Sequence, residues 1–133
     1  MARGEPAGAV VTRWLVDASN VIGSRPDGWW RDRDGATRRL LDRLDALART
    51  EPVTVVLDAG DPALTRREGP LQVVIAPHPG RDAADDEIVR MLEADPERAA
   101  WRVVTSDAEL ARRVRALGAE VEGAGGFRSR LDG

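Results

Sequence analysis

Aspartate is the residue type best placed to do chemistry in this sequence. The 133 residues include no Cys, Lys or Tyr and a single His, so thiolate, lysine and tyrosine nucleophiles and multi-histidine metal sites are excluded. Asp17, Asp58 and Asp107 each stand at the end of a short apolar run or directly after it. If the chain is an enzyme, its chemistry is therefore that of carboxylates.

Another group of Asp residues stands where a helix is expected to begin. Asp82 is separated from Asp85 and Asp86 by three and four residues, so that it can face the same point as either of them on a helix. The preceding His78 lies between two prolines, which is more typical of a loop residue than of a metal ligand. The first turn of this helix thus adds carboxylates to those at the ends of the apolar runs.

The elements that must position these carboxylates alternate along the chain. Four apolar runs are short, rich in β-branched residues and continuous, which is typical of strands buried on both faces of a parallel sheet. They lie at 14–16, 53–57, 71–76 and 101–105, with a weaker fifth strand at 119–122. Helical periodicity predicts helices over 37–49, 83–94 and 108–117, the last ending at Gly118. We expect irregular segments at 23–35 and 58–70, and a glycine-rich turn at 123–126 before a short closing segment at 127–131.

This alternation predicts an α/β fold, with three α/β/α layers around a mostly parallel central sheet of four to five strands. In such a sheet, ligands bind outside the carboxyl ends of the strands. Asp17, Asp58 and Asp107 would share that edge with the helix that begins near Asp82. Carboxylates that converge repel one another unless a cation neutralises them. Ligands that are all oxygen indicate Mg²⁺ or Mn²⁺, ions that serve phosphodiester chemistry.

Structural roles compete with this interpretation at each position. Asp82 could be a helix N-cap, and Asp85 and Asp86 could only complement the helix dipole. Ser106 and Glu109 have the spacing of a capping box around Asp107, and Asp58 could be a turn residue.

Composition and charge limit the setting. One domain is expected over 13–133, after a flexible lead at 1–12. The formal net charge of -3 does not exclude nucleic acid, because binding depends on where the 20 basic residues lie. The sequence has no signal-peptide pattern and no membrane-spanning run, so we expect a cytoplasmic protein without a membrane partner.

Four segments resemble NYN domains, especially the YacP-like group, within the PIN-like nuclease superfamily. Residues 16–23 (VDASNVIG) resemble the family's Asp-Gly-Tyr-Asn-hydrophobic-Ile-Gly opening, and 56–59 (VLDA) resemble its Val-Phe-Asp-Ala strand end. Residues 84–88 (ADDEI) resemble its Ala-Asp-acidic-x-Ile helix start, and 104–107 (VTSD) its Thr-Ser-Asp strand end. The match runs from about Trp14 to Val121. Ala18-Ser19 replaces the Gly-Tyr of the motif, and this removes an aromatic ring that could stack on a base.

The resemblance implies a PIN-like fold and a metal-dependent endoribonuclease, in which metal-activated water attacks a phosphodiester of single-stranded RNA. It implies that Asp17, Asp85 and Asp107 are the central metal-binding and catalytic carboxylates. Asp82 and Asp86 would be auxiliary ligands, and Asn20, Ser106 and Asp58 would support the site.

Arginine and tryptophan crowd the segment that follows the first strand. Arg offers bidentate phosphate contacts and Trp a stacking face, a combination suited to single-stranded RNA. The residues concerned are Arg25, Trp29, Trp30, Arg31 and Arg33. The same segment could instead be structural, with both Trp rings packed under the loop and the charges of 31–34 paired among themselves.

Other functions stay open at this stage. A catalytically weak RNA- or partner-binding module that keeps the fold is the main alternative, and the altered Ala18-Ser19 allows it. A haloacid dehalogenase-type phosphatase is disfavoured, because its Asp-x-Asp pair is absent at Asp17. An mRNA substrate, a homodimer, and a ribosome or antitoxin partner are each compatible with the sequence, which decides between none of them.

Overall fold

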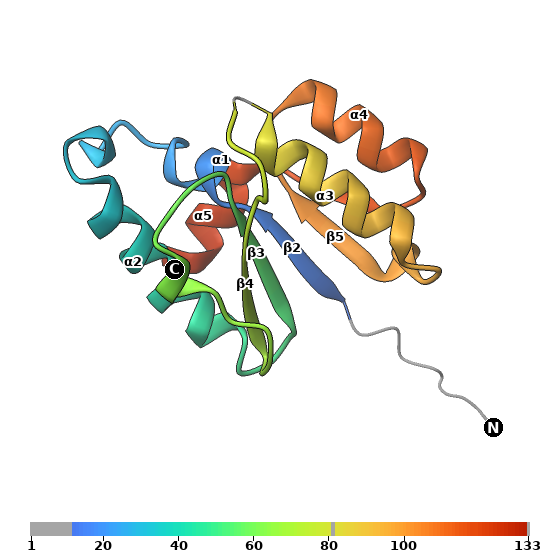
Figure 1. Cartoon of the computed structure of the whole chain (residues 1–133), viewed down its shortest axis with the longest axis horizontal. Helices are drawn as coiled ribbons and strands as arrows, with labels where there is room; N and C mark the ends of the chain where they lie inside the picture. The colour runs from blue at the N-terminus through green and yellow to red at the C-terminus, as the bar shows by residue number, and fades with distance from the viewer. Residues whose placement is uncertain (1–11, 81, 133) are drawn as a thin grey trace.

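A parallel sheet forms the centre of the molecule (Figure 1). In this computed structural model, which describes residues 12–80 and 82–132, the sheet has five strands in the order β4-β3-β2-β5-β6. Each neighbouring pair is parallel. The strands are β2 (Arg13–Asp17), β3 (Val53–Leu57), β4 (Leu71–Ile75), β5 (Trp101–Val104) and β6 (Glu120–Glu122).

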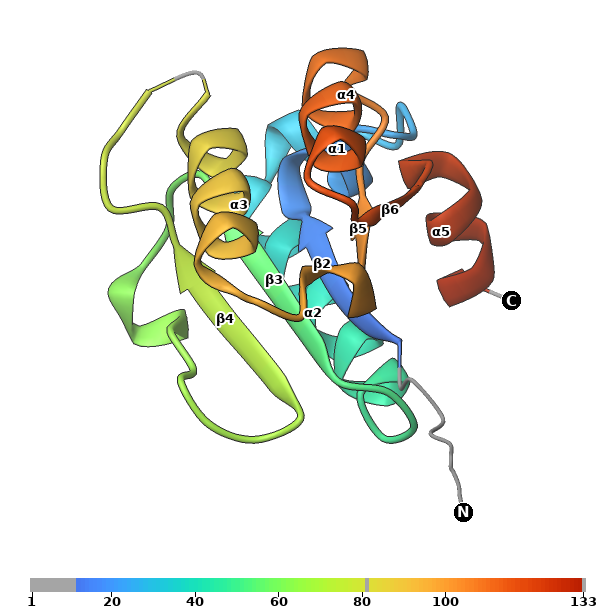
Figure 2. The ribbon, with the colours of Figure 1, turned by 90° about the vertical axis from the view of Figure 1, so that its right-hand side faces the viewer.

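Helices cover both faces of the sheet, which confirms the three-layer architecture (Figure 2). Side chains alternate along β2: Trp14 and Val16 belong to the core on one face, and Leu15 to the core on the other. The first face is covered by α1 (Ala18–Ile22), α2 (Arg33–Leu47) and α5 (Ala124–Asp132). The second is covered by α3 (Ala83–Ala94) and α4 (Ala108–Ala116). Three short 3-10 turns, η1 (Trp29–Arg31), η2 (Pro62–Leu64) and η3 (Arg98–Ala100), complete the elements of the described residues.

The predicted strands agree with the structure to within a residue or two, and α3 has the predicted bounds. The start predicted for α2 was wrong, because the helix begins at Arg33 and not at residue 37. Asp32 caps it by accepting a hydrogen bond from the Gly35 N–H at 3.0 Å. Apart from Thr12, the lead expected at 1–12 lies outside the described residues.

The glycine-rich turn predicted at 123–126 was also wrong, because Ala124 already begins α5. The Ser106 hydroxyl accepts a hydrogen bond from the Ala124 N–H at 2.9 Å, which satisfies one donor at the start of the helix. The Phe127 ring is fully buried with its centroid 5.1 Å from that of Trp14. Burial of this ring offsets the low helix propensity of the two glycines that precede it.

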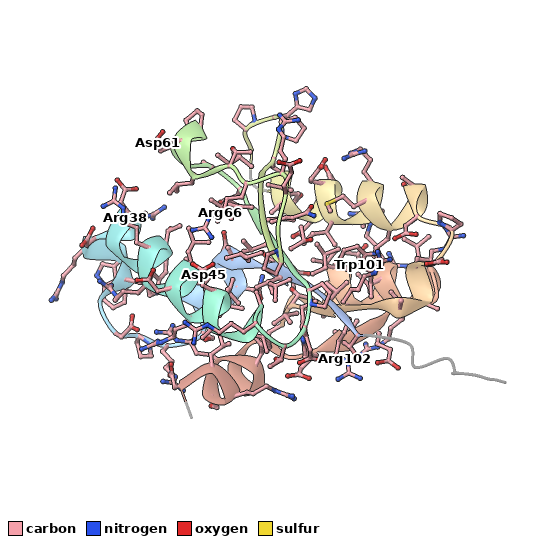
Figure 3. All side chains as sticks on the ribbon, turned by 90° about the horizontal axis from the view of Figure 1, so that it is seen from below. Arg38, Asp45, Asp61, Arg66, Trp101 and Arg102 are labelled. Atoms are coloured by element: carbon pink, nitrogen blue, oxygen red, sulfur yellow. The ribbon has the colours of Figure 1, made fainter. Side chains whose placement is uncertain are left out.

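Surface ion pairs connect neighbouring segments of this framework. Arg66 after η2 pairs with Asp45 of α2 at 2.8 Å, and Arg102 of β5 pairs with Glu120 of β6 at 2.7 Å (Figure 3). Across the described residues, no helix is long and apolar enough to cross a membrane.

The register of the strands brings their carboxyl ends to one edge. Asp17 at the end of β2 lies opposite Val56 of β3, and Val16 lies opposite Val104 of β5. The segments that follow these strands, and the start of α3, therefore meet at this edge, which is where the candidate site lies.

Candidate functional site

An open depression with a volume of about 170 Å³ lies at the carboxyl edge of the sheet. We call it the carboxylate depression. Its lining comes from the end of β2, the start of α1, the residue after β3, the start of α3 and the cap of α4. The lining residues are Asp17, Ser19, Asn20, Asp58, Asp82, Ala84, Asp85 and Asp107. The structure thus brings together five of the predicted site carboxylates and also the predicted supporting residue Asn20.

Asp17 is the buried centre of this depression. It ends β2 and is only 2% exposed. Its Oδ2 accepts hydrogen bonds from Asn20 Nδ2 at 2.8 Å and from Thr105 Oγ1 at 3.2 Å. Burial raises the pKa of Asp17 above its ordinary value, while these two hydrogen bonds favour the charged form and oppose that rise. Asp17 is therefore held in one orientation at the middle of the sheet edge.

Asp85 reports most clearly on the convergence of the carboxylates. It lies in the first turn of α3, and its pKa is raised to about 6, with burial as the largest cause. The negative charges of Asp17, Asp107 and Asp82 add to this rise, and the Arg113 guanidinium opposes it. The charges of three other carboxylates therefore act on Asp85, which shows that the four carboxyl groups lie close together.

Asp107 serves two purposes. It occupies the N-cap of α4, and its Oδ1 accepts a hydrogen bond from the Leu110 N–H at 3.0 Å while the carboxylate still lines the depression. The capping box suggested for Ser106 and Glu109 was therefore placed one residue too early. Glu109 instead pairs with Arg112 at 2.5 Å.

Ser106 and Asn20 connect the site to its surroundings. The Ser106 N–H donates to Asn20 Oδ1 at 3.0 Å, and the Ser106 hydroxyl caps α5 through Ala124. Ser106 is not among the residues that line the depression. Its observed contribution is to hold Asn20, which in turn donates to Asp17.

The remaining predicted acids differ in their placement. Asp82 stands at the N-cap position of α3 but accepts no capping hydrogen bond there, so its carboxylate is not used for capping. Asp58 lines the depression, and its Oδ1 accepts from the Ala59 N–H at 3.1 Å. Asp86 is set apart, because it pairs with Arg113 at 3.3 Å and lines a neighbouring depression beside His78.

Sequence reasoning assigned no role to Thr105, which belongs to the site. Its side chain is buried, its hydroxyl donates to Asp17, and its Oγ1 accepts the Asp107 N–H at 3.1 Å. One signal in the sequence could have indicated this role. Thr105 is a hydroxyl residue at the end of a buried strand, and it stands two positions before the candidate ligand Asp107. Thr105 thereby connects two of the three central carboxylates.

The candidate ligand atoms of the carboxylate depression are of the type that hard cations prefer. They are all oxygen atoms, and a cation would relieve the repulsion that raises the pKa of Asp85. Within residues 12–80 and 82–132, however, no three Asp, Glu, His or Cys side chains are arranged so that they could hold a metal ion. The side chains would have to draw closer together around an ion, so metal binding stays a prediction.

The Arg and Trp residues after β2 lie beyond the end of α1. Trp30 is the large apolar side chain left exposed among the described residues, at 49%, and its ring meets Trp29 edge to face with centroids 5.8 Å apart. The Arg31 guanidinium lies 6.0 Å from the Trp30 ring centroid, and that of Arg33 5.4 Å from the Trp29 ring centroid. Arg25 instead pairs with Asp132 of α5. Trp30, Arg31 and Arg33 are thus the exposed members of this group, whereas Arg25 and Trp29 are partly buried.

Comparisons with known proteins support the fold. No protein-family model matches the chain, and no curated protein matches it. A solved structure does match, the crystal structure of a variant of Rae1 (YacP) from Bacillus subtilis. The two share 20% of their residues over 91% of this chain and 75% of that chain, with a TM-score of 0.70. This chain has the YacP fold. The fold part of the resemblance noted in the sequence is thereby confirmed.

Proposed function

We propose that the chain is a metal-dependent endoribonuclease that hydrolyses phosphodiester bonds in single-stranded RNA. The observation that carries the proposal is the convergence of Asp17, Asp85 and Asp107, from three separate segments, on one depression at the carboxyl edge of the sheet. The sequence resemblance to YacP-like NYN domains and the fold shared with Rae1 (YacP) support the same reaction class.

Each central carboxylate has its own part in this proposal. A bound Mg²⁺ or Mn²⁺ would activate water and stabilise charge on the scissile phosphate. Asp17 would present a fixed oxygen ligand, because Thr105 and Asn20 hold its other oxygen in place. Asp107 is fixed by the hydrogen bond that its Oδ1 accepts from the Leu110 N–H at the start of α4. Asp85, whose pKa is about 6, gains most from a neighbouring positive charge.

Cleavage of an end-labelled single-stranded RNA with Mn²⁺ and Mg²⁺, and with chelator, tests this function. We expect cleavage with either metal, none with chelator, and a loss of at least about 100-fold in Asp17→Asn. Asp34→Asn is the matched control, because Asp34 is also an Asp in the first turn of a helix but lies away from the depression. Wild-type protein without activity towards any RNA in either metal, or Asp17→Asn with full activity, would overturn the proposal.

A second candidate is an RNA- or partner-binding module with weak catalysis. It is favoured by one observation, that in the described residues no three acidic side chains are already arranged to hold an ion. The same assay separates the two functions, since such a module would bind the RNA and leave it intact in both metals.

A further inference from the structure

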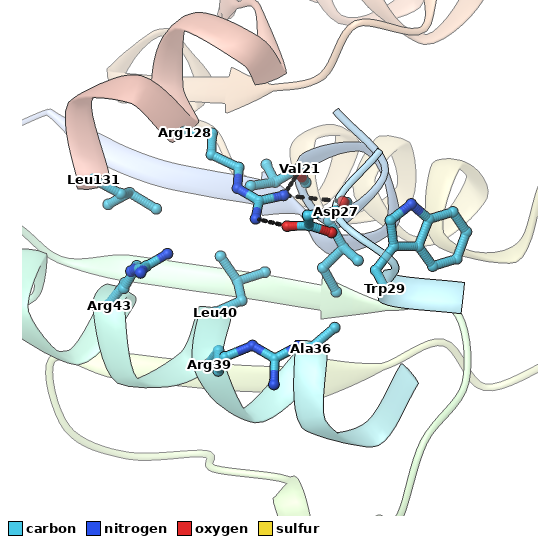
Figure 4. Close-up of a pocket in the computed structure, with 10 residues that line it drawn as sticks. Val21, Asp27, Trp29, Ala36, Arg39, Leu40, Arg43, Arg128 and Leu131 are labelled. Atoms are coloured by element: carbon cyan, nitrogen blue, oxygen red, sulfur yellow. Dashed lines mark hydrogen bonds and ion pairs between the residues drawn. The ribbon is translucent and has the colours of Figure 1, made fainter. Parts of the chain in front are cut away.

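A second, basic pocket lies on the other side of α1 from the carboxylate depression. Figure 4 shows it between α2 and α5, with Arg39 and Arg43 rising from one helix and Arg128 crossing from the other. Its volume is about 150 Å³. We call it the arginine pocket.

The lining of the arginine pocket combines apolar side chains with charged groups that are predominantly basic. Leu40, Leu131 and Ile22 contribute hydrocarbon surface. Arg128 pairs with Asp27 at 2.5 Å and Arg43 with Asp132 at 2.7 Å. Within the part of the chain that the structure describes, Arg39 is in none of the ion pairs, whereas Arg43 and Arg128 each have one. A guanidinium group is thus available beside the apolar side chains of the pocket.

The two pockets are connected by the same short helix. Ser19 and Asn20 of α1 line the carboxylate depression, and Val21 and Ile22 line the arginine pocket. At 1.5 Å of rise per residue, the whole of α1 spans only about 7 Å. Arg128 also donates to the carbonyl oxygens of Val21 at 3.2 Å and Ile22 at 3.0 Å, so that α5 fixes the end of this helix.

The ligand chemistry that fits is a nucleotide. A cavity of about 150 Å³ accommodates one aromatic ring, and an unstacked base of single-stranded RNA packs on apolar surface and on guanidinium planes. The phosphate attached to that base would meet the cation of Arg39. The separation across α1 suits a nucleotide close to the one at the carboxylate depression.

We propose that the arginine pocket receives one unstacked nucleotide of an RNA strand whose scissile phosphate lies in the carboxylate depression, and that Arg39 binds its phosphate. This inference rests on the proposed function, because it adds a subsite for the same substrate. It also assigns a role to α2 and α5, which lie outside the segments that resemble the NYN motifs.

Binding of a labelled single-stranded RNA, measured without divalent ions so that cleavage does not enter, tests the pocket. Arg39→Ala should weaken binding by about 10-fold. Arg38→Ala is the matched control, since Arg38 is an exposed Arg on the same helix that does not line the pocket (Figure 3), and it should bind like wild type. Equal affinity of Arg39→Ala and Arg38→Ala would overturn the proposal.

RNAs with a single abasic position provide the second measurement. One abasic position should weaken wild-type binding by about 10-fold and should weaken binding to Arg39→Ala much less, because both changes affect the same nucleotide. Equal losses in the two proteins would overturn the base pocket. So would displacement of the RNA by an acidic peptide as effectively as by unlabelled RNA, which would indicate a general anion site. Failure of cleavage with Mn²⁺ would refute the nuclease alone, since the binding measurements do not depend on it.

Discussion

Replacing Asp85 by Asn should stabilise the metal-free protein while it abolishes activity. The pKa of Asp85 is raised to about 6 by burial and by its acidic neighbours, from an ordinary value of 3.8. Each pKa unit corresponds to about 1.4 kcal/mol, so ionisation of Asp85 costs the folded state at most about 3 kcal/mol at pH 7. Asp85 is only half-buried and solvent screens its neighbours, and its charge also interacts favourably with the N-terminus of α3. We therefore expect a net gain of about 1 kcal/mol for Asp85→Asn.

The pH dependence of this gain identifies its cause. Well below pH 4, Asp85 is protonated in both the folded and the unfolded chain, so its ionisation contributes no difference in stability between wild type and Asp85→Asn. Between pH 4 and pH 6 the unfolded chain releases the proton first, and the wild type loses stability relative to the variant. Above pH 6 the difference should stay constant.

Thermal and urea unfolding with chelator present measure this difference. A gain of about 1 kcal/mol raises the melting temperature by about 4 °C for a domain of this size. Asp34→Asn serves as the control, because Asp34 also lies in the first turn of a helix but is not part of the carboxylate depression. The stability of Asp34→Asn relative to wild type should not rise with pH in this way. If Asp85→Asn is less stable than wild type at pH 7, or if its gain is the same at pH 4 and pH 7, the carboxylates do not converge as described.

Further predictions concern the capping carboxylate, the last helix and the exposed arginine. Asp107→Asn should keep the α4 cap, with stability within about 1 kcal/mol of wild type, and should lose RNA cleavage while RNA affinity holds or rises; a normal cleavage rate would leave Asp107 a cap alone. Gly126→Ala should stabilise the protein by about 0.5–1 kcal/mol in urea unfolding, since an added Cβ meets no atom within 4 Å; a loss of stability would contradict the helical assignment of Gly126. Arg31→Ala should weaken RNA binding and reduce its salt dependence, and should leave single-turnover cleavage of bound RNA unchanged; an unchanged affinity would remove Arg31 from the RNA surface.

The sheet could be predicted from sequence because its signals are local. Val53–Leu57 is a continuous run of β-branched and aliphatic residues, and the strand has those bounds. The meeting of Asp17, Asp85 and Asp107 followed from a general property of parallel sheets, that their carboxyl ends share one edge. Neither prediction needed knowledge of individual side-chain contacts.

The parts that could not be predicted depend on contacts between distant residues. Nothing local indicates that Ala124 begins a helix, since its cap comes from Ser106 and its anchor is the Phe127 ring against Trp14. The pairing of Arg25 with Asp132 likewise joins residues far apart in the sequence, and it places Arg25, a predicted RNA contact, against α5. The sequence predicted a capping box that starts at Ser106, because Ser is also a preferred N-cap residue, whereas the observed N-cap of α4 is Asp107.

Calorimetric titration of Mn²⁺ into the metal-free protein tests the central claim most directly, that Asp17, Asp85 and Asp107 together bind a divalent cation. We expect saturable binding to wild type and to Asp34→Asn, and at least a 10-fold loss of affinity in each of Asp17→Asn, Asp85→Asn and Asp107→Asn, because each removes one negative charge from the same site. Absence of Mn²⁺ binding at millimolar concentration, or binding that all three variants retain unchanged, would contradict the account.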